Sequence, residues 1–310
     1  MITSVETVGF TVSNLDEAKK FYTQVLPFTL VDEHEVMGDA YDRLTGLFGT
    51  RMRVARLKLG EEELQLTQYL TPPGGNPIPH DSRSNDLWFQ HIAIVVSDME
   101  DAYAQLREHN VQHVSTAPQT LPDYIEAAAG IKAFYFRDPD GHNLELIWFP
   151  EGKGAPRWQT ASNVFLGIDH TAIAVGDTQV SGFIYDICLG MEVGGVSTNY
   201  GTEQEHLNGV FGCRVHITGW NAAGGIGIEF LDYLTPIDGR RMPANTRPND
   251  LWHWETSLLS DNIELDYKTL TRQRMISAQI VDLPNRDVYG YARAFMFRDI
   301  DGHALKIVEK

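Results

Sequence analysis

Two histidines and two glutamates stand in strand-like segments of this chain, where their side chains could do chemistry. They are His91, Glu145, His170 and Glu229. Glu145 interrupts the apolar run LELIWF and Glu229 interrupts IEFLDYL, and a carboxylate that faces inward on such a strand is costly unless it is paired or metal-bound. Two imidazoles and two carboxylates are borderline-to-hard ligands that suit nickel, cobalt, iron, manganese or zinc. The residue types therefore suggest a site for one divalent transition metal.

The segments that carry these residues recur in two halves of the chain. The sequence FRDPDGH at 136–142 returns as FRDIDGH at 297–303. Three further pairs recur in the same order: GLFG at 46–49 and GVFG at 209–212, YLTP at 69–72 and 233–236, and NDLW at 85–88 and 249–252. Such self-similarity indicates a tandem duplication. We expect domains at 1–150 and 164–310, joined by a polar linker at 151–163 that holds two glycines and one proline.

Each half divides again into two units with the same order of elements. Apolar spacing predicts a helix over 15–26, and strand patterns follow at 57–59 and 64–70. A second unit begins with a strand at 90–96 and a helix at 99–109, and ends in a hairpin around an Asp-Gly turn. The second half repeats both units, with strands expected at 169–175, 226–234, 252–259, 294–297 and 304–309 and helices at 180–189 and 262–273. The pattern predicts an α+β fold of four βαβββ units.

The composition is that of an ordinary globular protein and excludes some partners. Of the 310 residues, 43% are hydrophobic and 22% charged, and the net charge of −17 argues against nucleic acid as a partner. Only two cysteines occur, Cys188 and Cys213, which fits a reducing compartment. The first ten residues, MITSVETVGF, show neither the basic region nor the apolar core of a signal peptide, and no stretch is long enough to span a membrane. We expect a cytoplasmic protein.

Four βαβββ units with a DPDGH-type turn before the last strand resemble the vicinal oxygen chelate superfamily. This superfamily includes glyoxalase I, extradiol dioxygenases, and bleomycin and fosfomycin resistance proteins. The resemblance covers nearly the whole chain apart from the linker. It implies that two units face each other and curl into a half-open barrel around one divalent metal. Each unit can give one ligand from its first strand and one from its last, and the histidines of the DGH turns, His142 and His303, are expected to be structural.

The resemblance also implies where the ligands lie. The first-strand positions of units one to four are Thr7, His91, His170 and Glu255, and the last-strand positions are Gln65, Glu145, Glu229 and Lys306. If neighbouring units pair, neither site has a full ligand set. If units two and three pair, they supply two histidines and two glutamates, and units one and four form a metal-free site where Glu255 and Lys306 could be an ion pair. We favour the second pairing, while the first, familiar from the dioxygenases, stays open.

A glyoxalase-like site implies a particular use of the metal. The metal would act as a Lewis acid that polarises a carbonyl group and holds an enediolate, with Glu145 the likelier base and Glu229 its opposite number. At the positions where glyoxalase I grips glutathione, the chain has Leu87, Ala174 and Tyr233. None of these binds an anion, so a glutathione adduct is not the expected substrate.

Three functions remain open from the sequence. The first is a metal-dependent lyase or isomerase that acts on a small carbonyl compound. The second is an extradiol-type dioxygenase, and the third is a non-catalytic protein that binds a drug or metabolite in the cleft between units one and four. Arg53 and His216, on inner strands of units one and three, are candidate substrate-binding residues. Four units already complete two clefts in one chain, so a monomer suffices, and a homodimer is compatible with the sequence.

Overall fold

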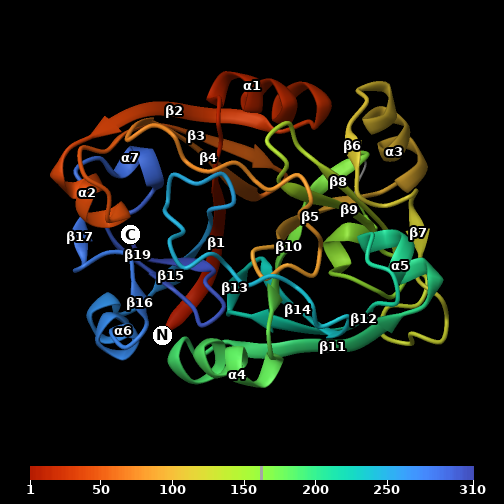
Figure 1. Cartoon of the computed structure of the whole chain (residues 1–310). Helices are drawn as coiled ribbons and strands as arrows, with labels where there is room; N and C mark the ends of the chain where they lie inside the picture. The colour runs from red at the N-terminus through yellow and green to blue at the C-terminus, as the bar shows by residue number, and fades with distance from the viewer. Residues whose placement is uncertain (161–162) are drawn as a thin grey trace.

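The computed structural model describes residues 1–160 and 163–310 and contains two large mixed sheets (Figure 1). The ten-stranded sheet, here called the first sheet, has the strand order β16-β18-β19-β15-β1-β4-β3-β2, with β13 and β17 attached to β1 and β18. The nine-stranded second sheet has the order β11-β12-β14-β10-β5-β9-β8-β6, with β7 attached to β8. The α+β class is confirmed. Two positions of the predicted linker, 161 and 162, lie outside the described residues.

The first sheet is built from units one and four, which come from opposite ends of the chain. Unit one supplies β1 (Ile2–Thr11), β2 (Thr29–Met37), β3 (Arg51–Leu59) and β4 (Glu62–Thr71). Unit four supplies β15 (Trp254–Ser260), β16 (Arg274–Met275), β17 (Val281–Asp282), β18 (Arg293–Arg298) and β19 (Ala304–Glu309). The short strand β13 (Gly224–Gly225) comes from unit three and pairs with β1.

The second sheet is built from units two and three, on either side of the linker. Unit two supplies β5 (Gln90–Val96), β6 (Gln112–His113), β7 (Gln119–Thr120), β8 (Lys132–Arg137) and β9 (Asn143–Trp148). Unit three supplies β10 (Phe165–Val175), β11 (Glu192–Tyr200), β12 (Arg214–Asn221) and β14 (Gly227–Thr235). The favoured pairing of units two and three, and of units one and four, is therefore confirmed.

Antiparallel first strands join the two units of each sheet. In the second sheet β10 pairs with β5, and His170 lies opposite Ala93. In the first sheet β1 pairs with β15, and Thr7 lies opposite Ser257. The register is the same in both, because His170 and Thr7 are both first-strand ligand positions. The two sheets therefore present equivalent positions, although the residues that occupy them differ.

One helix of each unit packs on the outside of its own strands. These helices are α1 (Leu15–Lys20), α3 (Met99–Glu108), α4 (Thr178–Phe183) and α6 (Ile263–Leu270), and Figure 1 shows α1 and α4 on opposite sides of the molecule. Asn14, Asp98, Asp177 and Asn262 cap them by accepting hydrogen bonds from backbone N–H groups of the first turn. The helix predicted over 15–26 is α-helical only to Lys20 and continues as the π-helix η1 (Phe21–Val25), and α4 likewise continues as η3 (Ile184–Cys188).

The remaining helices include two that cross from one unit to the other. In the first sheet α2 (Asp39–Thr45) of unit one contacts β17 and β18 of unit four, and in the second α5 (Thr202–Asn208) of unit three contacts β7 and β8 of unit two. The others are α7 (Arg286–Tyr289) and the 3-10 helix η2 (Pro156–Gln159). Neither α2 nor α5 was expected from the sequence, and each covers one side of a cleft. No helix among the described residues is long and apolar enough to cross a membrane.

The DGH turns fasten the two sheets to each other. Nδ1 of His142 donates to Asp138 Oδ2 at 2.8 Å, and its Nε2 lies 2.7 Å from the carbonyl oxygen of Leu251, just before β15. His303 makes the reciprocal contact, with Nε2 lying 2.8 Å from the carbonyl oxygen of Ala174 on β10. Both histidines are buried. Their contacts agree with the structural role expected for them.

Candidate metal centre

The four sequence-selected residues lie on adjacent strands of the second sheet. His91 is on β5, Glu145 on β9, His170 on β10 and Glu229 on β14. Ala93 lies beside both Glu145 and His170, and Ala172 lies beside both His91 and Glu229. Residues in register on neighbouring strands point to the same face of a sheet. The four long side chains therefore share one face and surround two small, fully buried alanines, which leaves room for their polar ends to converge.

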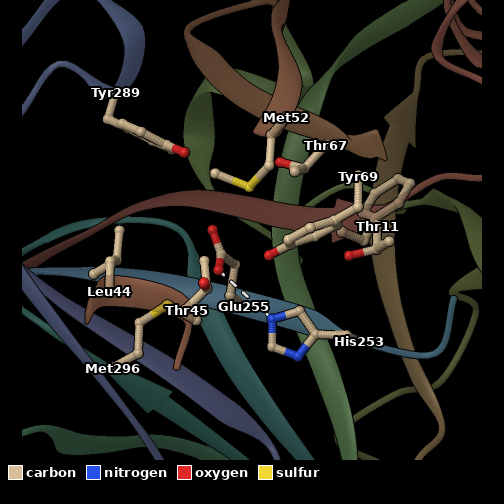
Figure 2. A pocket seen from close by; sticks show the side chains of 11 residues that line it. Thr11, Leu44, Thr45, Met52, Thr67, Tyr69, His253, Glu255, Tyr289 and Met296 are labelled. Carbon is tan, nitrogen blue, oxygen red and sulfur yellow. Dashed lines mark ion pairs between the residues drawn. The ribbon is translucent and has the colours of Figure 1, made fainter. Parts of the chain in front are cut away.

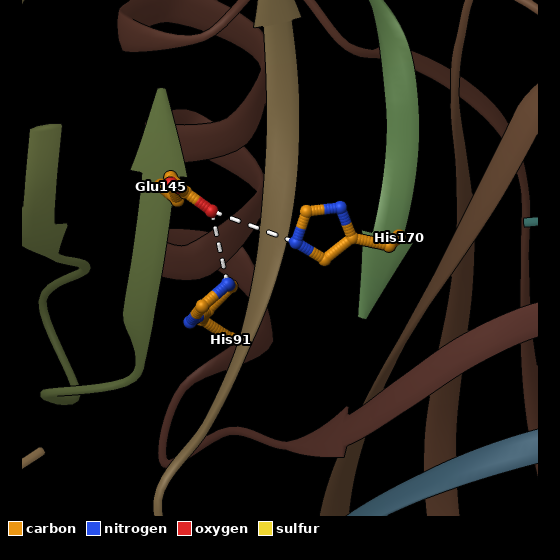
Figure 3. A group of neighbouring side chains, drawn as sticks. All are labelled: His91, Glu145 and His170. Carbon is orange, nitrogen blue, oxygen red and sulfur yellow. Dashed lines mark ion pairs between the residues drawn. The ribbon is translucent and has the colours of Figure 1, made fainter. Parts of the chain in front are cut away.

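The ends of the side chains come within a few ångströms of one another (Figure 3). Glu145 Oε2 lies 3.0 Å from His91 Nε2 and 3.7 Å from His170 Nε2. Glu229 Oε2 lies 3.3 Å from the same nitrogen of His170. One ligand atom from each of His91, Glu145 and His170 can be chosen so that all lie within 4.8 Å of one another. Such a group is compact enough to hold one metal ion.

Unsatisfied ring nitrogens show that the residues fit a metal. Nδ1 and Nε2 of His91 and Nε2 of His170 are buried and have no hydrogen-bond partner among the described residues. The 3.0 Å approach of His91 Nε2 to Glu145 is close in distance but lacks the geometry of a hydrogen bond. Burying a polar nitrogen without a partner is costly. A cation bound by the lone pairs of these Nε2 atoms and by the carboxylates would remove most of that cost.

The electrostatics of the cluster favour a positive charge at its centre. Burial lowers the pKa of His170, but the carboxylates of Glu229, Asp169 and Glu145 raise it further, to about 10. The pKa of Glu229 is raised overall. Burial raises it most, the charge of His170 lowers it, and the charge of Glu145 raises it. In metal-free protein, a proton on His170 would supply part of the positive charge that the carboxylates favour. A metal would have to displace that proton.

Asp169 and Trp158 hold His170 in position. Nδ1 of His170 lies 3.0 Å from Asp169 Oδ2, and Nε1 of Trp158, on η2, donates to Asp169 Oδ1 at 2.7 Å. Burial raises the pKa of Asp169, but the hydrogen bond and charge of His170 lower it overall. A carboxylate on Nδ1 leaves Nε2 as the nitrogen that binds a metal, and it fixes the orientation of the ring. His91 has no such partner on Nδ1 among the described residues.

A cavity of about 600 Å³ opens beside the cluster. Glu145, His170 and Glu229 line it, together with two residues of the linker, Gly154 and Ala155. The side chain of Glu229 is 32% exposed, whereas those of Glu145 and His170 are each 6% exposed. This volume lies within the range of small-molecule sites in proteins. The candidate metal centre is therefore reachable by a small ligand, mainly past Glu229.

Side chains nearly fill the equivalent cleft of the first sheet, and Figure 2 shows the residues that line it. Its cavity measures only about 20 Å³, room for about one water molecule. Leu44 and Thr45 of α2, Met52 of β3, Tyr289 of α7 and Met296 of β18 are among the side chains that line it. A cavity of this size does not admit a drug or metabolite. The structure therefore gives no support to the binding function suggested for the cleft between units one and four.

An ion pair occupies the ligand positions of the first sheet. Lys306 Nζ lies 2.5 Å from Glu255 Oε1, and both side chains are largely buried. Burial raises the pKa of Glu255, but the charge of Lys306 lowers it more, to about 2. The other two positions are neutral: Thr7 Oγ1 is 3.1 Å from the hydroxyl of Tyr291, and Gln65 Nε2 donates to Thr67. The ammonium of Lys306 thus stands where a metal would lie, as the ion-pair interpretation anticipated.

The two candidate substrate-binding residues lie away from the 600 Å³ cavity. Arg53, on β3 of the first sheet, points to the side of α1 and makes ion pairs with Asp16 and Glu33. His216 is on β12 of the second sheet, and its Nδ1 lies 3.2 Å from Thr198 Oγ1. Its neighbour Ile217 lines the cavity, so strand alternation turns His216 to the other face. The structure does not bring either residue to the candidate site.

Asp169 escaped the sequence analysis because of a local irregularity in β10. Ile168 pairs with Ile94 of β5 and His170 pairs with Ala93, so β10 advances by two residues while β5 advances by one. Asp169 is the extra residue of this bulge, and a bulge re-aims side chains away from simple alternation. Strict alternation would place Asp169 on the face opposite His170. The only sequence signal was a carboxylate directly before a candidate ligand.

Comparison with known proteins agrees with this architecture. Residues 4–146 match the family model described as the glyoxalase/bleomycin resistance protein/dioxygenase superfamily. A 2-epi-5-epi-valiolone epimerase from Actinomyces sp is 35% identical over 155 residues, which cover 48% of this chain and 81% of the epimerase. A metallothiol transferase FosB from Staphylococcus epidermidis is 28% identical over 148 residues, covering 47% of this chain and 84% of the transferase.

Solved structures share the fold over the whole chain. Glyoxalase I from Zea mays superposes with a TM-score of 0.60 at 15% identity, covering 99% of this chain and 92% of that protein. A putative dioxygenase from Bacillus subtilis gives a TM-score of 0.59 at 17% identity, with coverage of 99% and 85%. At these identities the likeness concerns the fold alone. The family match over residues 4–146 and the 35% identity to the epimerase, of which 81% is covered, establish that this chain belongs to the glyoxalase/bleomycin resistance protein/dioxygenase superfamily.

Proposed function

We propose that the chain is a metal-dependent lyase or isomerase that acts on a small carbonyl compound. The observation that carries this proposal is the convergence of His91, Glu145 and His170, whose buried ring nitrogens have no hydrogen-bond partner among the described residues. These residues, with Glu229, would hold one nickel, cobalt, iron, manganese or zinc ion. When bound, such an ion supplies Lewis-acid polarisation of a substrate carbonyl oxygen.

We assign proton transfer to Glu229. Its carboxylate lines the cavity and contacts only one of the two histidines, His170. Glu145, in contrast, is buried between the Nε2 atoms of both His91 and His170 and has little room to move. The base must reach a proton on the carbon next to the carbonyl group and take it. Glu229 fits that task better than Glu145. The family resemblance, in contrast, implied that Glu145 is the likelier base.

The identity of one relative supports an isomerase over a lyase. The protein from Actinomyces sp is named an epimerase, and an epimerase inverts one stereocentre of its substrate. Removing a proton next to a carbonyl and returning it to the other face of the same carbon does this without any second substrate. Glu145 and Glu229 come from opposing units and approach the centre from β9 and β14. Glu229 would remove the proton on one side of the substrate, and Glu145, which is held in place on the other side, would return a proton without having to move.

Hydrogen exchange tests the proposal. Protein loaded with nickel or cobalt is incubated in D₂O with α-hydroxy ketones, such as dihydroxyacetone and 2-hydroxycyclohexanone, and loss of the carbon-bound proton is followed by NMR. We expect metal-dependent exchange that Glu229→Gln lowers by about 10²–10⁴-fold while the metal is retained. Glu192→Gln, which changes an exposed carboxylate of the same sheet, is the matched control. Exchange at the buffer rate with wild type, or undiminished exchange with Glu229→Gln, would contradict the proposal.

A dioxygenase is the second candidate, and the tight grouping of His91, Glu145 and His170 favours it. Two histidines and one carboxylate form the ligand set of non-haem iron oxygenases, which leave open positions on the metal. In that case Glu229 would not be required as a base. Oxygen uptake by the iron(II)-loaded protein with catechols, persisting in Glu229→Gln, would support this function. Absence of oxygen uptake, together with hydrogen exchange that needs Glu229, would exclude it.

A further inference from the structure

The two walls of the 600 Å³ cavity differ in polarity. Unit two presents apolar side chains, among them Leu121, Ile131, Ile147 and Phe149. Unit three also presents apolar side chains, such as Leu207 and Ile217, and adds the uncharged polar ones: Ser197, Asn199, Gln204 and Asn221. The candidate metal centre lies between the two walls, since Glu145 comes from unit two and Glu229 from unit three. A ligand that reaches the centre therefore meets an apolar surface on one side and hydrogen-bonding groups on the other.

The charged groups of the cavity are unfavourable to an anion. None of the described residues that line it is a lysine or an arginine. Three carboxylates line it, those of Glu145, Asp169 and Glu229, beside the imidazole of His170. Recognition of a phosphate or carboxylate group in proteins normally uses arginine, lysine or clustered backbone N–H groups. A ligand with a negatively charged tail would lie against these walls without a cationic partner.

Gln204 supplies a hydrogen-bonding group that the protein itself does not use. It is on α5, the helix that crosses from unit three to unit two, and its side chain lines the cavity although the residue is only 3% exposed. Its Oε1 has no hydrogen-bond partner among the described residues. Asn199, also buried, lies on the same wall and accepts a hydrogen bond from Ser197 at 2.9 Å. Buried amides without partners are costly, so a bound ligand is the natural partner for Gln204.

From these observations we infer that the site takes an uncharged, polyhydroxylated carbonyl compound, whose hydroxyl groups bind Gln204 and Asn199. Its less polar face lies against Ile131, Ile147 and Phe149. The inference rests on the proposed function, because the carbonyl group is the part that the metal centre would act on. An apolar diketone would leave the amide of Gln204 unpaired, and an anion would face the carboxylates alone.

Three ring ketones separate these alternatives. They are scyllo-inosose, which is uncharged and polyhydroxylated, 2-hydroxycyclohexanone, which has one hydroxyl group, and 3-dehydroquinate, which adds a carboxylate. Each is titrated into cobalt(II)-loaded protein and followed by the cobalt absorption spectrum, with calorimetry as a second measurement that does not depend on the metal. We expect the affinity for scyllo-inosose to be at least about tenfold higher than that for 2-hydroxycyclohexanone or 3-dehydroquinate. One or two additional hydrogen bonds supply a difference of this size.

Variants test which side chains of the cavity cause the preference for scyllo-inosose. Gln204→Leu should lower the affinity for scyllo-inosose about tenfold and leave that for 2-hydroxycyclohexanone unchanged. Gln105→Leu, which removes an amide of α3 that donates to the carbonyl oxygen of Val25, is the matched control and should change neither. Ile131→Arg places a cation in the apolar wall and should raise the affinity for 3-dehydroquinate.

Two results would overturn the inference: binding of 3-dehydroquinate or 2-hydroxycyclohexanone at least as tight as that of scyllo-inosose, or an unchanged affinity in Gln204→Leu. A failure of the proposed function looks different. If the protein binds no cobalt, or binds it without catalysing hydrogen exchange, the metal-dependent reaction is refuted, while calorimetry with the three ketones still decides the class of ligand.

Discussion

The two clefts of this molecule share a scaffold and differ in what their equivalent positions hold. In the second sheet, two histidines and two glutamates surround a point that a 600 Å³ cavity reaches. In the first sheet, the same positions carry threonine, glutamine, glutamate and lysine, and the cavity has shrunk to about 20 Å³. The strand register is the same in both. Ligand geometry is therefore a property of the fold, whereas metal binding depends on a few side chains placed on it.

The closed cleft also shows how the charge of a lost metal can be replaced. Glu255 occupies a ligand position and is buried, so its carboxylate needs a cation. Lys306 comes from the last strand of the same unit and supplies an ammonium at 2.5 Å. Methionine and leucine side chains fill the remaining space. One cleft thus holds the candidate metal centre, and the other holds a buried ion pair.

Removing the ammonium of the closed cleft should have the largest effect on folding. Lys306→Ala leaves Glu255 buried without its ammonium partner, with the ring of His253 3.6 Å from its carboxylate. Breaking a buried ion pair in this way costs about 3–5 kcal/mol of unfolding free energy. Urea denaturation measures the loss. The double variant Lys306→Met with Glu255→Gln removes both charges and should recover most of it. A loss below about 1 kcal/mol in Lys306→Ala would mean that the pair contributes no more than an exposed ion pair does.

The two clefts of the metal-free protein should respond to pH in opposite directions. The pKa of Glu255 is lowered from 4.5 to about 2, so its contribution to stability is complete above pH 4.5 and is lost as the pH falls through 2. The pKa of His170 is raised from 6.5 to about 10, so its contribution is complete below pH 6.5 and is lost as the pH rises through 10.

Unfolding free energies against pH, measured with a chelator present, test this contrast. Each contribution amounts to at most about 3–5 kcal/mol for shifts of this size. Glu255→Gln should remove the acid-side loss alone, and His170→Gln the alkaline-side loss alone. The contrast is contradicted if Glu255→Gln removes the alkaline-side loss or His170→Gln removes the acid-side loss. It is also contradicted if the unfolding free energy of wild type does not fall above pH 6.5.

Loosening the orientation of His170 should weaken the metal centre without abolishing it. Asp169→Asn and Trp158→Phe remove successive links of the chain that holds the ring, and loss of such support lowers metal affinity about 10–100-fold. Cobalt titration measures the affinity, and the cobalt spectrum reports the altered ligand field. Trp148→Phe, which removes an indole donor to Ser97 outside the site, is the control. Equal affinity in wild type and Asp169→Asn would show that His170 needs no such support.

Arg53 should matter least to the chemistry. Its guanidinium pairs with Asp16 and Glu33 on the helix side of the first sheet. Arg53→Gln should therefore change the unfolding free energy by about 1 kcal/mol or less and leave metal content and hydrogen exchange unchanged. A drop of tenfold or more in exchange rate would return Arg53 to the list of substrate-binding residues.

Much of the site could be predicted because it lies on regular, buried strands. The apolar strands at 90–96, 143–149 and 169–175 have clear patterns, and the repeat relates each of them to a counterpart in another unit. The family resemblance then marked one position on each first and last strand. For that reason the pairing of units two and three, and the convergence of His91, Glu145, His170 and Glu229, could be anticipated from the sequence together with that resemblance.

The parts that were missed lack such patterns. Strand β2 lies at the edge of its sheet, is largely solvent-exposed, and shows only weak alternation of apolar and polar residues. The first five residues of β11 include two valines and two glycines, a composition that is also typical of a loop. The crossing helices α2 and α5 are short and follow Gly38 and Gly201 without a side-chain cap, so no start signal marks them. As a result Gln204, which α5 brings to the cavity, could not be singled out. Arg53 and His216 do not line the 600 Å³ cavity, and their substrate-binding role stays a prediction.

Metal content measures the central claim most directly. Wild type, His91→Ala, His170→Ala and Glu255→Ala are purified without chelators and examined by elemental mass spectrometry. The account predicts one transition metal per chain in wild type and in Glu255→Ala, and loss of the metal in both histidine variants, because one ion binds to both rings in the second sheet. Metal that persists in either histidine variant, or that disappears with Glu255→Ala while the protein stays folded, would contradict it.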